Sequence, residues 1–305
     1  MDKKDFDLLV ALDENARQSL QALGRRVGLS APAVRERLLR LEDHGILQGY
    51  WVSIDPAIFG RKNLLVYFAG ERTREEAERA LDASDVAWVA WKVDGGITVQ
   101  VWPRHMNRAL ASLTRFIGRE PSWRGVSRSN WRGTLSGLDW RVLETLIDEP
   151  RAPVERLGTV SGLSPKTVRK HLERLLREEA VFVVPRLGFL SDAGDLVYHL
   201  LVSGVVTFPD LRRTLGDVVL IHETAEPPRK YLFCRADSLG DLTARTHALR
   251  KLPTVSDVEV TLNREMLLGT AYVHALVREH IDRWTERPKG RTRAAVDRNN
   301  SRHEP

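Results

Sequence analysis

Cysteine is almost missing from this sequence, which limits the chemistry that the chain can support. Cys234 is the single cysteine among 305 residues, so neither an intrachain disulfide nor a cysteine-cluster metal site can form. The histidines lack His-x-x-x-His or Glu-paired metal spacing, and neither a glycine-rich phosphate loop nor a Ser-His-Asp arrangement is recognisable. We therefore expect no catalytic residue, no metal and no cofactor, and a reducing compartment.

A long hydrophobic run is missing as well. The longest apolar stretch, residues 196–208, is interrupted by His199, Ser203 and Gly204 and is too short to span a bilayer. The first residues also lack the apolar core of a signal peptide. These features predict a cytoplasmic protein without a membrane partner.

The charge balance is mildly basic. The chain carries 47 Lys and Arg against 41 Asp and Glu, a net charge of +6, and its isoelectric point is near 9.6. This excess suits a polyanionic partner, although ordinary solubility explains it equally well. The length allows two to four small domains.

One segment occurs twice in the chain. Its serines, Ser30 and Ser164, are 134 residues apart, and the same offset relates Asp5 to Asp139. Each copy predicts three helices, of which the third begins after the serine and carries an apolar stripe at positions i, i+4 and i+7. In the first copy this stripe is Val34, Leu38 and Leu41. A duplicated helix-turn-helix is therefore predicted, and this motif points to DNA.

A different pattern follows each helix-turn-helix. Residues 46–54 are rich in strand formers around Gly49 and predict a two-stranded wing. Residues 64–131 then show the order strand, helix, strand, strand, helix, strand, with a tight turn at residues 94–96. Residues 196–262 repeat this order, and residues 267–284 predict a closing helix. The βαββαβ order is typical of ferredoxin-like domains.

The predicted fold class is α+β, with two winged helix-turn-helix domains alternating with two βαββαβ ferredoxin-like domains. The expected domains are a winged helix-turn-helix over 1–60, a sensing and dimerisation domain over 61–133, a second winged helix-turn-helix over 134–190, a second ferredoxin-like domain with its closing helix over 191–285, and a disordered basic tail over 286–305.

This arrangement resembles the Lrp/AsnC (feast/famine) family of transcription regulators. The likeness is carried over residues 1–60 by Asp5, Leu8-Leu9, Ala16-Arg17, Leu23-Gly24, Val27-Gly28-Leu29-Ser30, Val34, Arg37, Arg40-Leu41, Gly45-Ile46 and Ile54-Asp55-Pro56. Family members usually carry one such unit per chain, whereas this chain resembles two in tandem.

The resemblance implies a DNA-binding domain joined to a ligand-sensing, dimerising one, the RAM domain. It also implies a small-molecule effector, often an amino acid or another metabolite, near the turn between the second and third strands of that domain. The effector contacts implied here are Trp91, Asp94, Gly95 and Gly96.

A recognition helix lies in the major groove and presents its outward side chains to the bases and phosphates. Arginine can donate two hydrogen bonds to a guanine edge, and lysine or arginine can neutralise phosphates. The alternative is a solvated helix face. The residues predicted to contact double-stranded DNA are Ser30, Ala31, Ala33, Arg35, Arg37 and Arg40 in the first copy, and Ser164, Lys166, Thr167, Arg169, Lys170 and Arg174 in the second.

Both faces of the predicted strands are apolar. Trp88 and Ala90 alternate with Val89 and Trp91 in one strand, and other strands repeat the pattern. Such a face would associate if it were exposed. We expect self-association through the sheet faces, and favour pairing of the two sensing domains of one chain as a pseudo-dimer. A cavity at that interface would be a natural effector site.

Two alternatives differ from the regulator interpretation. Siroheme decarboxylases resemble the same architecture, but their His-Asn-Tyr-x-Arg run is missing here, where His222 is followed by Glu223 and Thr224. A non-enzymatic adaptor, in which the helix-turn-helix units bind protein, is the other alternative. The regulator interpretation predicts that the chain is not an enzyme.

Overall fold

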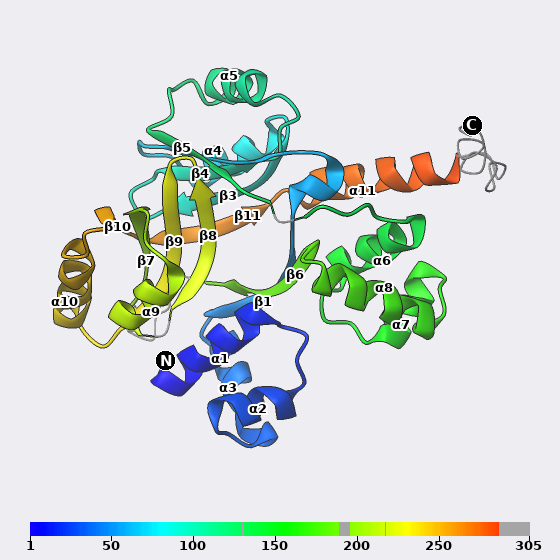
Figure 1. Cartoon of the computed structure of the whole chain (residues 1–305), viewed down its shortest axis with the longest axis horizontal. Coiled ribbons are helices and arrows are strands. Elements are labelled where there is room, and N and C mark those ends of the chain that lie inside the picture. Colours follow the sequence, from blue (N-terminus) through cyan, green and yellow to red (C-terminus); the bar gives the residue numbers. More distant parts are fainter. Residues whose placement is uncertain (130, 189–195, 217, 287–305) are drawn as a thin grey trace, which may run out of the picture.

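The computed structural model describes residues 1–129, 131–188, 196–216 and 218–286. All but the first residue of the predicted basic tail, 286–305, lies outside these ranges. Figure 1 shows two helical units, at the bottom and the right, and two sheets, at the top and the left. No helix in the described ranges combines the length and the apolar character needed to cross a membrane.

Two three-helix units contain the predicted motifs. Their helices are α1 (Lys3–Glu14), α2 (Leu20–Val27) and α3 (Ala31–Asp43) in the first, and α6 (Gly137–Asp148), α7 (Val154–Ser161) and α8 (Pro165–Arg177) in the second. Gly28, at φ 70°, forms the turn between α2 and α3, a left-handed conformation that glycine adopts without strain. Val34, Leu38 and Leu41 form the buried face of α3, as their spacing predicted.

The strand that follows each third helix pairs with its counterpart in the other unit. Strands β1 (Leu47–Ile54) and β6 (Val181–Leu187) form an antiparallel two-stranded sheet with Val52 opposite Val183. The prediction of a two-stranded wing within residues 46–54 is therefore wrong. Gly49, at φ 106°, permits an irregularity in the β1–β6 register rather than a hairpin turn.

The two βαββαβ segments form antiparallel sheets with the ferredoxin-like strand order. The first segment has β2 (Asn63–Phe68), α4 (Arg74–Arg79), β3 (Val86–Lys92), β4 (Ile97–Val101), α5 (Met106–Ile117) and β5 (Trp123–Ser127); the second has β7 (Leu196–Gly204), α9 (Phe208–Leu215), β8 (Val219–Ala225), β9 (Pro228–Ala236), α10 (Leu239–Arg250) and β10 (Val255–Thr261). The strand orders are β3-β4-β2-β5 and β10-β7-β9-β8. Helices α4 and α5 cover one face of the first sheet, and α9 and α10 cover one face of the second.

The chain then crosses from the second sheet to the first. Strand β11 (Asn263–Leu268) follows β10 directly but pairs with β3, so the first sheet has five strands. The prediction of one closing helix over residues 267–284 is wrong at its start, because α11 (Thr270–Thr285) begins only after Gly269. Gly269 donates a backbone hydrogen bond to Ala87 (2.8 Å), and an added Cβ would lie 2.9 Å from the carbonyl oxygens of Val86 and Ala87.

The uncovered faces of the two sheets face each other within the chain, as the apolar strand faces predicted. At one edge, Val126 of β5 and Glu226 exchange backbone hydrogen bonds of 3.1 and 3.4 Å. At the other edge, the chain runs directly from β10 into β11. The two sheets are thereby linked at both edges.

Helix α11 connects the first sheet to the second helical unit. It packs along α6, and the ring of His280 stacks on Trp140 with centroids 4.4 Å apart. The first helical unit instead touches the second sheet, where the rings of Phe6 and Phe233 lie 5.6 Å apart. Each helical unit is therefore anchored to the sheet of the other half of the chain, and Figure 1 shows α11 extending from β11 along the second unit.

Candidate nucleic-acid interface and inter-sheet cavity

The third helices of the two units, α3 and α8, begin in the same way. Ser30 Oγ accepts a hydrogen bond from Ala33 N (3.3 Å), and Ser164 Oγ accepts one from Thr167 N (3.2 Å). Both serines are exposed, whereas Ala31, Ala33 and Thr167 are half-buried. The remaining N–H groups of each first turn have no partner within the helix, so both N-termini are suited to contact phosphate.

The two helices differ in the cations that they present. On α8, Lys166, Arg169 and Lys170 are exposed, and no carboxylate of the described residues forms an ion pair with them. On α3, Arg35 is exposed in the same way, but it is followed by Glu36. Arg40 is 45% exposed and lies 3.6 Å from a carboxylate of its own unit. The second unit therefore has the more basic outer face.

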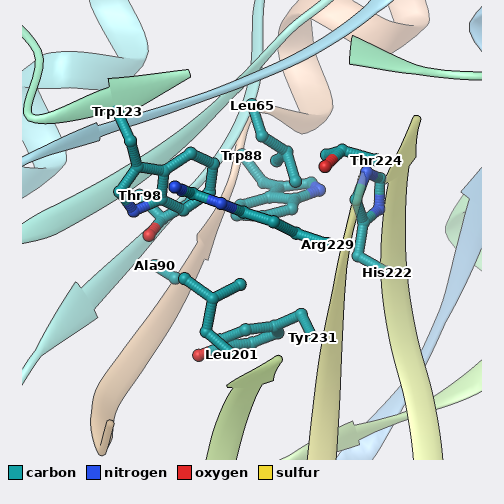
Figure 2. A pocket seen from close by; sticks show the side chains of 10 residues that line it. All are labelled: Leu65, Trp88, Ala90, Thr98, Trp123, Leu201, His222, Thr224, Arg229 and Tyr231. Carbon is teal, nitrogen blue, oxygen red and sulfur yellow. The ribbon is translucent and has the colours of Figure 1, made fainter. Parts of the chain in front are cut away.

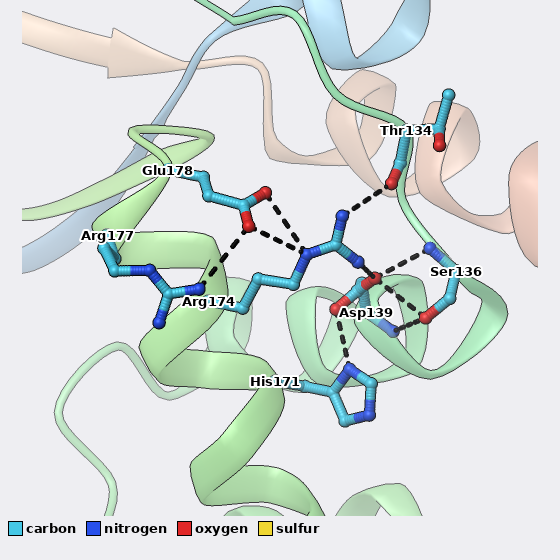
Figure 3. A network of polar contacts seen from close by, with 7 residues as sticks. All are labelled: Thr134, Ser136, Asp139, His171, Arg174, Arg177 and Glu178. Atoms are coloured by element: carbon cyan, nitrogen blue, oxygen red, sulfur yellow. Dashed lines mark hydrogen bonds and ion pairs between the residues drawn. The ribbon is translucent and has the colours of Figure 1, made fainter.

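Asp139 is the centre of a polar network in the second unit (Figure 3). Its carboxylate accepts hydrogen bonds from Ser136 N (2.7 Å) and Ser136 Oγ (2.8 Å), lies 2.7 Å from His171 Nδ1, and accepts a 2.7 Å hydrogen bond from Arg174 Nη1. Arg174 Nη2 also donates to the carbonyl of Thr134 (2.9 Å). Burial opposes ionisation of Asp139, but the hydrogen bonds from His171 and Ser136 and the charge of Arg174 outweigh it and lower the pKa.

Asp5 has the same position in the first unit. Arg37 Nη1 donates to Asp5 and to Asp2, each at 2.7 Å, and Asp2 and Asp5 form a reciprocal capping box. The prediction that Arg37 and Arg174 point outward is wrong, because both guanidinium groups are directed toward these carboxylates; the side chains are 21% and 31% exposed. The matched pair Asp5 and Asp139 was the sequence signal for this network.

The predicted effector turn already contacts neighbouring residues of its own domain. Asp94 accepts hydrogen bonds from the hydroxyl of Tyr67 (3.2 Å) and from Gly96 N (2.9 Å). An added Cβ at Gly95 would lie 2.5 Å from the Cα of Glu71. Burial and the adjacent Asp94 carboxylate raise the pKa of Tyr67 to about 12, which keeps its hydroxyl protonated.

The side chain of Trp91 makes its contacts outside that turn. Its Nε1 donates to the carbonyl of Arg72 (3.1 Å), and the guanidinium of Arg264 lies 4.8 Å from its ring centroid. Trp91 borders an open hollow with Gln48, Val93, Arg264 and Glu265, whereas Asp94, Gly95 and Gly96 are not among the residues that line it. The structure therefore does not bring the four predicted effector residues together at one hollow.

A cavity lies between the two sheets (Figure 2). Its volume is about 30 Å³. Residues of both sheets line it: Leu65, Trp88, Ala90, Thr98 and Trp123 from the first, and Leu201, His222, Thr224, Arg229 and Tyr231 from the second. Most of this wall is apolar or aromatic, with a few polar groups between, as is usual for small-molecule sites. None of the predicted effector residues at the turn lies here.

The inter-sheet histidines are held neutral. His222 Nε2 lies 2.6 Å from Ser127 Oγ, across the boundary between the sheets, and burial lowers the pKa of His222 to about 4. Burial, together with the charge of Lys92, lowers the pKa of His199 to about 3. At neutral pH neither imidazole therefore carries a charge.

Two helix-turn-helix families match the chain in tandem. The AsnC-type helix-turn-helix domain matches residues 1–42, and the winged helix-turn-helix DNA-binding domain matches residues 135–181. The first match runs from α1 to Glu42 in α3, and the second contains α6, α7 and α8.

Known regulators are similar to a part of the chain. An uncharacterized HTH-type transcriptional regulator, PH0045, of Pyrococcus horikoshii is 42% identical over 60 residues, which are 20% of this chain and 39% of the relative. The HTH-type transcriptional regulator LrpA of the same organism is 36% identical over 76 residues, 25% of this chain and 52% of the relative. The chain thus spans about half or less of the curated relatives that it matches.

Solved structures are similar to the chain only at low sequence identity and low TM-score. The siroheme decarboxylase NirDL is 10% identical, with a TM-score of 0.48, over 93% of this chain and all of its own. The leucine response regulatory protein LrpA of Mycobacterium tuberculosis is 19% identical, with a TM-score of 0.31, over 44% of this chain and 96% of its own. The two domain matches show an AsnC-type helix-turn-helix followed by a winged helix-turn-helix within one chain.

Proposed function

We propose that this protein is a transcriptional regulator that binds double-stranded DNA sequence-specifically through α3 and α8. The observation that carries the proposal is the pair of capped recognition helices with exposed cations, Arg35 on α3 and Lys166, Arg169 and Lys170 on α8. Exposed basic side chains at such a helix neutralise phosphates and reach guanine edges. A cytoplasmic location and the absence of catalytic activity go with this function.

One chain would supply both recognition helices, α3 and α8, for a DNA site. The β1–β6 pairing joins the two helical units, and α11 holds the second unit against the first sheet. A fixed separation of two recognition helices suits two half-sites about one helical turn, roughly 34 Å, apart. Two readers in one chain remove the need for a homodimer at a single site, although self-association of whole chains is part of the proposal for longer sites.

Control by a small-molecule effector also belongs to the proposal. The turn at Asp94, Gly95 and Gly96, and the nearby Trp91, stay predicted contacts. The cavity between the sheets is the second place where an effector could bind, because residues of both halves of the chain line it. Binding there would be coupled to the separation of the recognition helices through the shared sheets.

The test is a selection of bound DNA from random duplex oligonucleotides, followed by gel-shift titration of the selected sequence. The double variant Arg35→Ala with Arg169→Ala should weaken binding about 100-fold or more, since each arginine contributes roughly 1–3 kcal/mol. Arg108→Ala with Arg115→Ala, two exposed arginines of α5, removes the same charge and should leave the affinity within about twofold. Failure to enrich any sequence, or equal affinity in both double variants, would contradict the proposal.

The enzyme and adaptor alternatives give different outcomes. A siroheme decarboxylase needs room for a tetrapyrrole, and the inter-sheet cavity of about 30 Å³ holds only a few atoms. An absorbance titration with siroheme should therefore show no saturable spectral change. A stoichiometric change would favour the enzyme, and failed DNA selection with a captured protein partner would favour the adaptor.

A further inference from the structure

We propose that the cavity between the two sheets binds a small organic monocarboxylate, with its carboxylate on Arg229 of β9 and its apolar body against Trp88 and Leu201. The ligand would be the effector of the proposed function, and the inference rests on that function only for this role. The site itself depends on the chemistry of the cavity wall.

The first observation is the state of the Arg229 guanidinium. It lies across the cavity toward Trp123 (Figure 2), with the guanidinium carbon 4.9 Å from the ring centroid. Arg229 Nε and Nη1 are buried, and no acceptor among the described residues reaches them. A stacked ring compensates part of the charge but accepts no strong hydrogen bond from these atoms. Arg229 is thus a half-buried cation with two buried donors that lack an acceptor, and an anion would complete this site.

The second observation is that Trp123 provides another hydrogen-bond donor without an acceptor. Its Nε1 is buried and also lacks an acceptor among the described residues. Three other polar groups of the wall have partners: His222 Nε2 lies 2.6 Å from Ser127 Oγ, the hydroxyl of Tyr231 donates to Asn263 Oδ1 (3.0 Å), and the hydroxyl of Thr224 donates to the carbonyl of Pro227 (2.6 Å). The open groups of Arg229 and Trp123 are all donors, so the missing partner is an acceptor. A carboxylate offers two oxygens that match the fork of an arginine.

The wall decides between an organic and an inorganic anion. Four apolar side chains line the same cavity: Leu65, Trp88, Ala90 and Leu201. They would remove water from an inorganic anion without offering hydrogen bonds in its place. A short apolar body gains from contact with these side chains. Because the volume is only about 30 Å³, the body is small, or the aromatic side chains shift to admit it.

The position of Trp88 connects the proposed carboxylate site to the second helix-turn-helix unit. Trp88 of β3 lies opposite Leu268 of β11, and β11 continues through Gly269 into α11, which packs on α6. A ligand that displaces Trp88 therefore acts on the strand that leads to the second helix-turn-helix unit. Through this path, a ligand bound in the cavity would change the distance between α3 and α8.

The experiment measures thermal unfolding and tryptophan fluorescence of the full chain with sodium acetate, propionate, isobutyrate and benzoate, each compared with its neutral amide at equal ionic strength. At least one carboxylate should raise the melting temperature saturably, while its amide, chloride and inorganic phosphate should not. Arg229→Met should weaken the binding of that carboxylate at least tenfold. Arg124→Met, an exposed arginine of β5, is the matched control and should bind as the wild type does.

Several results would contradict the proposed carboxylate site. They are equal shifts with carboxylate and amide, equal shifts with chloride or phosphate, no shift with any of the four carboxylates, or unchanged binding by Arg229→Met. If Arg229→Met fails to fold, Arg229→Lys provides the second test, because a single ammonium should lose the bidentate contact and bind more weakly. DNA binding is measured separately, so carboxylate binding without DNA binding would contradict the regulator function and leave the site standing.

Discussion

Arg174 Nη1 and Asp139 Oδ2 lie 2.7 Å apart between α8 and α6 of the second helix-turn-helix unit. This contact turns a basic side chain of the recognition helix toward the interior of its own domain. In the first unit, Arg37 makes the corresponding kind of contact with Asp5. Each unit therefore uses part of the positive charge of its third helix to hold that helix in place. The exposed cations that remain are those available to DNA.

Replacing Asp139 with asparagine should destabilise the second helical unit. The carboxylate side chain is fully buried, at 0% exposure, and removing its charge leaves the guanidinium of Arg174 without its buried partner. Breaking a buried ion pair in this way costs about 3 kcal/mol. Chemical denaturation monitored by circular dichroism measures the loss of unfolding free energy. Glu173→Gln, an exposed position on α8, is the control and should change the free energy by less than about 0.5 kcal/mol; equal losses in both variants would contradict the buried network.

The contribution of Asp139 should disappear in acid. Its folded-state pKa is lowered from the ordinary value of 3.8, so the native state binds fewer protons than the unfolded state there. The stabilisation is complete above the unfolded value and is lost as the pH falls through the lower folded value. The difference in unfolding free energy between wild type and Asp139→Asn should be constant above about pH 5 and should shrink below about pH 4. A difference that grows on acidification would contradict the assigned network.

The two recognition helices should contribute unequally to DNA affinity. Helix α8 presents Lys166, Arg169 and Lys170, whereas α3 presents Arg35 beside Glu36. Each phosphate contact that is lost reduces the slope of log affinity against log salt by about 0.9. Lys166→Ala with Lys170→Ala should therefore lower the slope by about 2, and Arg35→Ala by about 1 at most. Fluorescence anisotropy over a salt series measures both slopes, and a larger loss in the α3 variant would reverse the predicted asymmetry.

The local structure of the helical units was predictable because short-range rules determine it. A serine cap three residues before a backbone N–H, a left-handed glycine and an i, i+4, i+7 apolar stripe define α3 without knowledge of other elements. The two βαββαβ segments were predictable for a similar reason, since alternation and tight turns mark their strands.

The long-range pairings were not predictable from the same patterns. Strand β1 satisfies its hydrogen bonds as well with β6 as with a local hairpin, and nothing in residues 46–54 distinguishes the two. The apolar run at Leu267 and Leu268 continues into α11, so its first residues fit a helix until β3 offers an edge. The orientations of Arg37 and Arg174 depend on carboxylates on other helices. For the cavity, the sequence alone did not identify Arg229, because its environment is made by two sheets from distant segments.

The pairing of β1 with β6 should be detectable as a covalent link within one chain. Val52 and Val183 are directly opposite in the antiparallel register and both are buried, so cysteines there would lie within disulfide range. Mild oxidation of Val52→Cys with Val183→Cys should give a monomeric species of faster mobility on a non-reducing gel. Cys234 is buried, and burial raises the pKa of its thiol to about 12, so it should not compete.

The control moves one cysteine by a single position. Phe182 lies opposite Ser53 and is 41% exposed, and neighbouring strand residues point to opposite faces. Val52→Cys with Phe182→Cys should therefore remain reduced under the same conditions. If the first pair instead produced disulfide-linked dimers, β1 would pair between chains. The two DNA readers would then belong to an assembly of several chains, and the proposed one-chain spacing of half-sites would be wrong.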